Sequence, residues 1–141
     1  MDKNINLFMK KLHSINGFHN VKFVILYGSR STGLFRNDSD YDFAIYYNGN
    51  KRERFDFLIK ANFNENFDAK IFQDLPLYIM KDVLKGKVVY VEDLGFLYDV
   101  AYKTIKSFDS FKKYYYDYIS RRPEVKWYGE KRLGLVKLKI I

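Results

Sequence analysis

Two carboxylates stand two positions apart in the segment Asp40-Tyr41-Asp42, at the head of an apolar stretch that ends at Tyr47. Successive side chains of a strand point to opposite faces, so both carboxylates are expected on one face and Tyr41 on the other. Two oxygen ligands on one face suit Mg²⁺, which favours carboxylates together with phosphate oxygens. The alternative is a solvated, Asp-rich turn that leads into an edge strand.

A second candidate for chemistry is the dipeptide Gly28-Ser29, which ends a short, β-branched, apolar run from Val21 to Tyr27. The run predicts a buried strand. A turn that leads from such a strand into a helix offers backbone N–H groups and a hydroxyl to phosphate oxygens. An ordinary strand-to-helix turn is the alternative.

The two candidates belong to one sequence pattern. Leu26-Tyr27-Gly28-Ser29-Arg30-Ser31-Thr32-Gly33 is followed by Ser39-Asp40-Tyr41-Asp42, with ten residues between Ser29 and Asp40. This pattern resembles the signature of the DNA polymerase β-like nucleotidyltransferases, and more narrowly that of the minimal nucleotidyltransferases (MNT) that partner HEPN proteins. Residues 1–120 are also similar to that family in size and in the order of elements.

The resemblance implies roles for six residues. Asp40, Asp42 and Asp68 would be the catalytic carboxylates and the ligands of Mg²⁺, with Asp68 as the family's third carboxylate on a later strand. Gly28, Ser29 and Arg30 would bind the phosphates of ATP, and Arg30 would neutralise charge on the pyrophosphate leaving group. From the residues alone, Asp68 could instead pair with Lys70, and Arg30 could be a surface residue.

The resemblance also implies an activity and a partner. Proteins of this kind use ATP to adenylylate a tyrosine of a HEPN ribonuclease toxin, and they act as its antitoxin. One alternative is a small-molecule nucleotidyltransferase of the antibiotic-modifying type, for which 141 residues leave little room for a second domain. The residues are also compatible with a non-catalytic antitoxin that acts by binding alone and with a nucleic-acid-binding protein.

Strand and helix patterns alternate along the chain and predict an α/β (α+β) fold, with a mixed β-sheet flanked by helices and a long C-terminal helix. Strands are expected at 21–27, 40–47, 67–72, 87–91 and 136–140, and helices at about 5–15, 51–62, 76–84 and 94–119. Asp74 is expected to cap the helix that Pro76 opens. The expected domain organisation is one domain over residues 1–120, which the resemblance implies is a nucleotidyltransferase, and a basic tail over residues 121–141.

The composition excludes several classes of protein. The absence of cysteine excludes a disulfide scaffold, a thiol nucleophile and a cysteine-ligated zinc site. No apolar run approaches the roughly 18 residues of a membrane span, and no signal peptide is recognisable, so a cytoplasmic protein without a membrane partner is expected. The net charge is +8, but residues 1–111 hold 16 basic and 14 acidic residues, whereas residues 112–141 hold 9 and 3. The excess charge indicates a partner surface in the tail, through which any nucleic-acid contact would be made.

Overall fold

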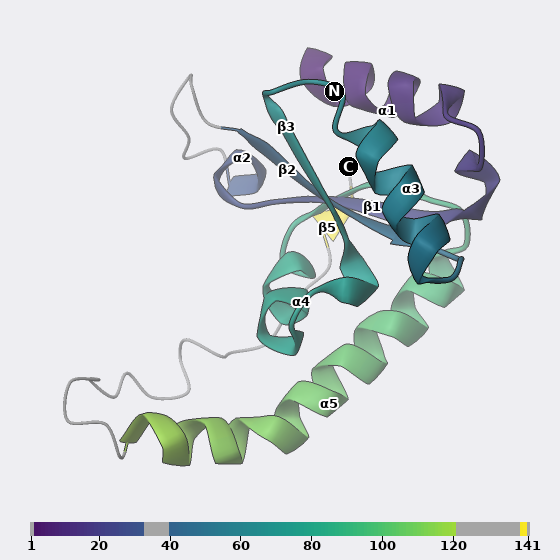
Figure 1. The fold of residues 1–141 in the computed structure, drawn as a ribbon. Coiled ribbons are helices and arrows are strands. Elements are labelled where there is room, and N and C mark those ends of the chain that lie inside the picture. The colour runs from purple at the N-terminus through teal and green to yellow at the C-terminus, as the bar shows by residue number, and fades with distance from the viewer. Residues whose placement is uncertain (1, 33–39, 121–138, 141) are drawn as a thin grey trace.

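The structure, a computed structural model, describes residues 2–32, 40–120 and 139–140 and consists of one β-sheet with helices on both faces (Figure 1). The elements in chain order are α1 (Lys3–Ser14), η1 (Phe18–Asn20), β1 (Val21–Tyr27), α2 (Ser29–Thr32), β2 (Tyr41–Tyr47), α3 (Lys51–Ala61), β3 (Phe67–Ile71), η2 (Phe72–Asp74), α4 (Leu77–Val83), β4 (Lys87–Val91), α5 (Leu94–Ser120) and β5 (Lys139–Ile140). The four strands and four main helices expected between residues 3 and 120 begin and end within two residues of the expected positions. The predicted fold class, including the long C-terminal helix, is confirmed.

The sheet has the strand order β3-β2-β1-β4-β5. β2 runs antiparallel to β1 and parallel to β3, while β4 runs antiparallel to β1 and parallel to β5. The end of β1 and the starts of β2 and β3 therefore lie side by side at the same end of the sheet. Because β2 has a strand on each side, the edge strand of the alternative interpretation is wrong, whereas the turn of that alternative lies in residues 33–39, outside the described part of the chain.

Residues of the strands alternate between two hydrophobic clusters. Along β2, Tyr41, Phe43, Ile45 and Tyr47 belong to the cluster that includes α1 and α3, whereas Ala44 and Tyr46 belong to the cluster that includes α4 and α5. Burial of both faces stabilises the sheet by removing apolar surface from water. The alternation assigns Asp42 to the α4/α5 face, away from Tyr41, as the sequence predicts.

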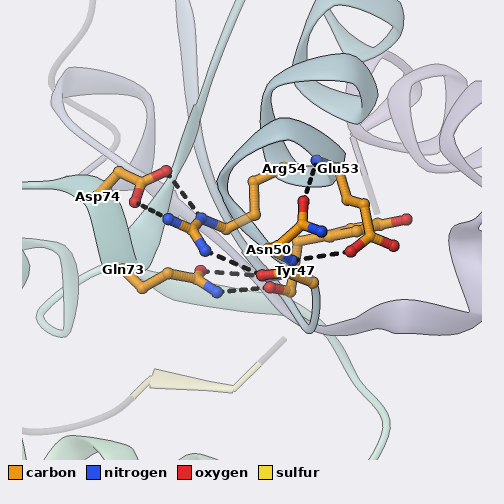
Figure 2. A network of polar contacts seen from close by, with 7 residues as sticks. Tyr47, Asn50, Glu53, Arg54, Gln73 and Asp74 are labelled. Carbon is orange, nitrogen blue, oxygen red and sulfur yellow. Dashed lines mark hydrogen bonds and ion pairs between the residues drawn. The ribbon is translucent and has the colours of Figure 1, made fainter.

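A polar network ties the far end of β2 to α3 and η2 (Figure 2). Arg54 forms a two-pronged ion pair with Asp74 at 2.9 and 3.1 Å and donates a third hydrogen bond to the carbonyl of Gly49 at 2.9 Å. The Gln73 side chain exchanges hydrogen bonds with the backbone N–H and C=O of Tyr47. The prediction that Asp74 caps α4 is wrong, because its carboxylate is used by Arg54 and the cap position is taken by Pro76 without a side-chain hydrogen bond.

The amphipathic helix α5 covers the α4/α5 cluster with Leu97 and Ala101, which are buried. Among the described residues, no helix is both long and apolar enough to cross a membrane. Of the tail, Lys139 and Ile140 pair with the start of β4. Residues 121–138 lie outside the described part of the chain, so the predicted boundary at 120 stays a prediction, as does the role of the tail.

Candidate active site

Two of the three predicted carboxylates are neighbours on adjacent strands. Asp42 and Asp68 are register partners in the parallel β2–β3 pair. The residues on either side of Asp68, Phe67 and Ala69, are buried in the α1/α3 cluster, so Asp68 is assigned to the same α4/α5 face as Asp42. Asp40 lies just before β2 and is exposed to solvent.

The carboxylates interact electrostatically. The pKa of Asp42 is raised, first by burial of its carboxyl group and then by the negative charge of Asp68, with a smaller contribution from Asp40. Lys70 acts in the opposite direction, and its Nζ lies 3.9 Å from Oδ2 of Asp68. The ion pair between Asp68 and Lys70 that the residues alone allow is therefore present. A positive charge between Asp42 and Asp68 would relieve their repulsion.

The backbone of Gly28 packs directly against Asp42. Gly28 has a φ of 73°, in the left-handed region, and a Cβ at this position would lie 2.5 Å from Oδ2 of Asp42. Only glycine can take this conformation without strain while leaving room for the carboxylate. The predicted phosphate-binding turn and the predicted metal-binding carboxylate are thus in contact.

The turn that follows Gly28 is closed by hydrogen bonds back to it. Ser29 begins the short helix α2, as predicted. Ser31 is buried, and both its backbone N–H and its hydroxyl donate to the carbonyl of Gly28, at 3.2 and 2.8 Å. Sequence reasoning did not single out Ser31, although a hydroxyl three residues after a strand-ending glycine is a recognisable turn-closing pattern.

The third residue of the predicted phosphate-binding turn, Arg30, lies on the other side of the sheet. Its guanidinium carbon is 4.4 Å from the ring centroid of Tyr41, which belongs to the α1/α3 cluster. The structure therefore does not bring Arg30 together with Asp42 and Asp68. Its role in binding phosphate stays a prediction.

Tyr27 is a residue of the site that sequence reasoning missed. It pairs with Asp42 across the antiparallel β1–β2 ladder and is packed against the α4/α5 cluster. Burial, together with the charges of Asp42 and Asp68, raises the pKa of Tyr27 to about 12, so its phenol stays protonated at neutral pH. The only signal in the sequence was its position immediately before Gly28.

The polymerase beta nucleotidyltransferase family (Polymerase beta, Nucleotidyltransferase) matches residues 10–94, which is more than half of the chain and includes all six predicted site residues. This chain belongs to the polymerase beta nucleotidyltransferase family. The resemblance inferred from the Gly28-Ser29 and Asp40/Asp42 spacing is confirmed.

One named relative and several solved structures are similar to this chain, the first in sequence and the others in fold. A protein of Methanocaldococcus jannaschii that is named as a protein adenylyltransferase is 32% identical over 72 residues, which cover 50% of this chain and 57% of that protein. A chain of a toxin–antitoxin crystal structure with AMP-PNP is similar in fold, with a TM-score of 0.67, 19% identity and coverage of 84% of this chain and 97% of that one. A tri-AMPylated HEPN toxin in complex with MNT antitoxin, from Shewanella oneidensis, contains a chain with a TM-score of 0.63, 18% identity and coverage of 84% and 94%.

The carboxylates of this nucleotidyltransferase fit a divalent cation. Asp42 and Asp68 are two hard oxygen donors side by side whose mutual repulsion a cation would remove. Over residues 2–32, 40–120 and 139–140, no three His, Cys, Asp or Glu side chains are grouped as a ready-made metal cluster. The fitting donor set is therefore the pair Asp42 and Asp68, which Asp40 and phosphate oxygens of a substrate would complete.

Proposed function

We propose that this chain is a Mg²⁺-dependent nucleotidyltransferase that transfers AMP from ATP to a tyrosine of a HEPN-type toxin and acts as the antitoxin of that toxin. The observation that carries the proposal is the register pair of Asp42 and Asp68, with Gly28 packed against Asp42. The name of the M. jannaschii relative supports protein adenylyl transfer. The toxin–antitoxin complexes that share the fold support a HEPN-type partner and an adenine nucleotide.

In the proposed reaction, the tyrosine oxygen of the toxin attacks the α-phosphorus of ATP. The bond from that phosphorus to the bridging oxygen breaks, and pyrophosphate leaves. Mg²⁺ bound by Asp40, Asp42 and Asp68 would neutralise charge on the phosphate oxygens. The backbone N–H groups of the Gly28–Ser29 turn donate hydrogen bonds to the triphosphate, and Asp68 accepts the proton of the attacking hydroxyl.

The test uses the full chain, ATP, MgCl₂ and a HEPN-type protein from the same genome, and it follows the intact mass of both proteins. The expected result is a mass increase of one or more AMP groups on the HEPN-type protein. Asp42→Asn and Asp68→Asn should abolish the increase. Asp56→Asn is the matched control, because Asp56 is an exposed carboxylate on α3, the helix that covers the opposite face of the sheet.

A Tyr→Phe series in the HEPN-type protein then identifies the acceptor. An unmodified HEPN-type protein, together with complete neutralisation of its toxicity by Asp42→Asn, would contradict the proposal and favour an antitoxin that acts by binding alone. Transfer of AMP to small hydroxylated molecules but not to the protein would favour a small-molecule nucleotidyltransferase.

A further inference from the structure

The side chain of Tyr41 lies on the α1/α3 face of the sheet, opposite to Asp42. From there it contacts the start of α1 and Arg30 in α2. The hydroxyl of Tyr41 donates to Oδ2 of Asp2 at 2.8 Å and accepts from Nδ2 of Asn4 at 3.2 Å. The face of the same ring carries the guanidinium of Arg30, 4.4 Å from the ring centroid. Tyr41 therefore contacts both the residues that begin α1 and the residue that follows Gly28-Ser29.

The ring of Tyr41 is itself fixed by the core. It is 3% exposed, and the ring of Phe67 meets it edge-on with centroids 5.9 Å apart. Its backbone N–H donates to the carbonyl of Asn66 at 2.9 Å, which fixes the start of β2 against the loop before β3. A buried aromatic ring has few accessible rotamers, so hydrogen bonds to its hydroxyl help to hold the Tyr41 ring in one of them.

The N-terminal partner of Tyr41 is the carboxylate of Asp2. Asp2 also accepts from the backbone N–H of Asn4 at 2.7 Å, as the N-cap of α1. Burial acts to raise the pKa of Asp2, but its hydrogen bonds to Tyr41 and the backbone, together with the charge of Arg30, lower it overall. Asp2, Tyr41 and Arg30 therefore interact with one another: Tyr41 is hydrogen-bonded to Asp2 and lies against Arg30, and the charge of Arg30 acts on Asp2.

Tyr41 lies between Asp40 and Asp42, and Arg30 lies two residues after Gly28. A shift of the ring would move the carboxylates of β2 and the phosphate-binding turn relative to each other. We propose that Tyr41 is a positioning residue for nucleotidyl transfer, which aligns the Asp40/Asp42 segment with the Gly28–Arg30 turn and uses Asp2 as its anchor. The inference rests on the proposed function, because it concerns the alignment of that site.

The experiment compares two tyrosines of the same strand and face. Tyr41→Phe keeps the ring and removes the hydrogen bonds to Asp2 and Asn4. Tyr47→Phe is the matched control, since Tyr47 is also buried on the α1/α3 face of β2 but lies at the far end, where its hydroxyl accepts from Nδ2 of Asn20 at 3.4 Å. Each variant is measured for its unfolding temperature, for the dissociation constant of ATP with MgCl₂, and for kcat and KM of AMP transfer.

We expect Tyr41→Phe to lower kcat/KM for ATP about tenfold, within the up to about 100-fold loss that a misalignment near 1 Å produces. Tyr47→Phe should leave kcat/KM unchanged even if both variants lower the unfolding temperature equally. Asp2 is exposed, and Asp2→Asn should reproduce part of the loss in kcat/KM. The double variant Asp2→Asn/Tyr41→Phe should lose less kcat/KM than the two single losses combined, because both changes break the same contact.

Failure of this inference and failure of the proposed function give different results. If the wild-type chain transfers AMP and Tyr41→Phe matches Tyr47→Phe in kcat and KM, the positioning role of Tyr41 is overturned and the proposed function stands. If the wild-type chain binds ATP but transfers nothing, the proposed function fails, and the inference survives only if Tyr41→Phe weakens ATP binding more than Tyr47→Phe. If wild type neither binds ATP nor transfers AMP, both are overturned.

Discussion

Gly28 and Asp42 are in such close contact that a Cβ on residue 28 would lie 2.5 Å from Oδ2 of the carboxylate. The contact joins the end of β1 to the start of β2, and with it the proposed phosphate-binding turn to the proposed metal ligand. Any side chain at residue 28 must displace either the turn or the carboxylate. The same contact explains why a glycine ends β1 with a φ of 73°.

Gly28→Ala should therefore reduce both stability and activity. The left-handed backbone alone costs about 1–2 kcal/mol in free energy of unfolding for a residue with a Cβ, and displacement of Asp42 should abolish transfer of AMP. Urea unfolding and an ATP-binding titration measure the two effects. Gly95→Ala in the first turn of α5 is the control and should leave ATP binding unchanged, since its Cβ would approach only Oδ1 of Asp93 among the described residues, at 3.3 Å. Normal ATP binding by Gly28→Ala would contradict this account of the turn.

Asp42→Asn should abolish transfer while leaving the fold at least as stable as wild type. Because the pKa of Asp42 is raised in the folded protein, its ionised form lowers stability, and this loss appears only as the pH rises above the unfolded-state pKa of about 4. The variant should thus gain stability relative to wild type as the pH rises above about 4. MgCl₂ should stabilise wild type more than the variant. Thermal unfolding across pH, with and without MgCl₂, measures both, and equal stabilisation by MgCl₂ would contradict the metal assignment.

Lys70→Gln should shift the pH dependence of catalysis. Lys70 lowers the pKa of Asp42 and pairs with Asp68, so its loss should raise the pKa of Asp42. The acidic limb of the kcat/KM profile should then move to higher pH, because the ionised carboxylate is the active form. Lys60→Gln on α3 removes an exposed positive charge from the helix on the other face and should not move this limb. A profile for Lys70→Gln that superimposes on wild type would show that Lys70 does not act on Asp42.

Arg54→Lys should lower stability without changing catalysis. Lysine cannot reproduce the two-pronged pairing of Arg54 with Asp74 or the additional hydrogen bond to Gly49. The network drawn in Figure 2 lies at the Tyr47 end of β2. Asp42 lies near the other end of this strand, so kcat/KM for ATP should stay at the wild-type value. Thermal unfolding and steady-state kinetics test the two statements, and a fall in kcat/KM without loss of stability would contradict them.

The strands and the helices could be predicted from the sequence because each depends on a local pattern, and local patterns also indicated candidate residues for the site. Alternation of polar and apolar residues predicted β2 and the common face of Asp40 and Asp42, and helical spacing predicted α5. The order of Gly28-Ser29 and Asp40-Tyr41-Asp42 was enough to identify the family, since a phosphate-binding turn and a carboxylate pair on consecutive strands are contained in 15 residues.

Only the tertiary structure decided which distant residues meet. The family resemblance implied that Asp68 joins Asp40 and Asp42, but its pairing with Asp42 depends on β3 lying parallel to β2, and no local pattern specifies strand order or register. The same holds for Tyr27 beside Asp42, for Arg30 on the ring of Tyr41, and for Asp74, whose carboxylate binds Arg54 instead of capping α4. A side chain takes the partner that packing brings within reach, so sequence determined the chemistry available to this protein and the fold determined which groups share a site.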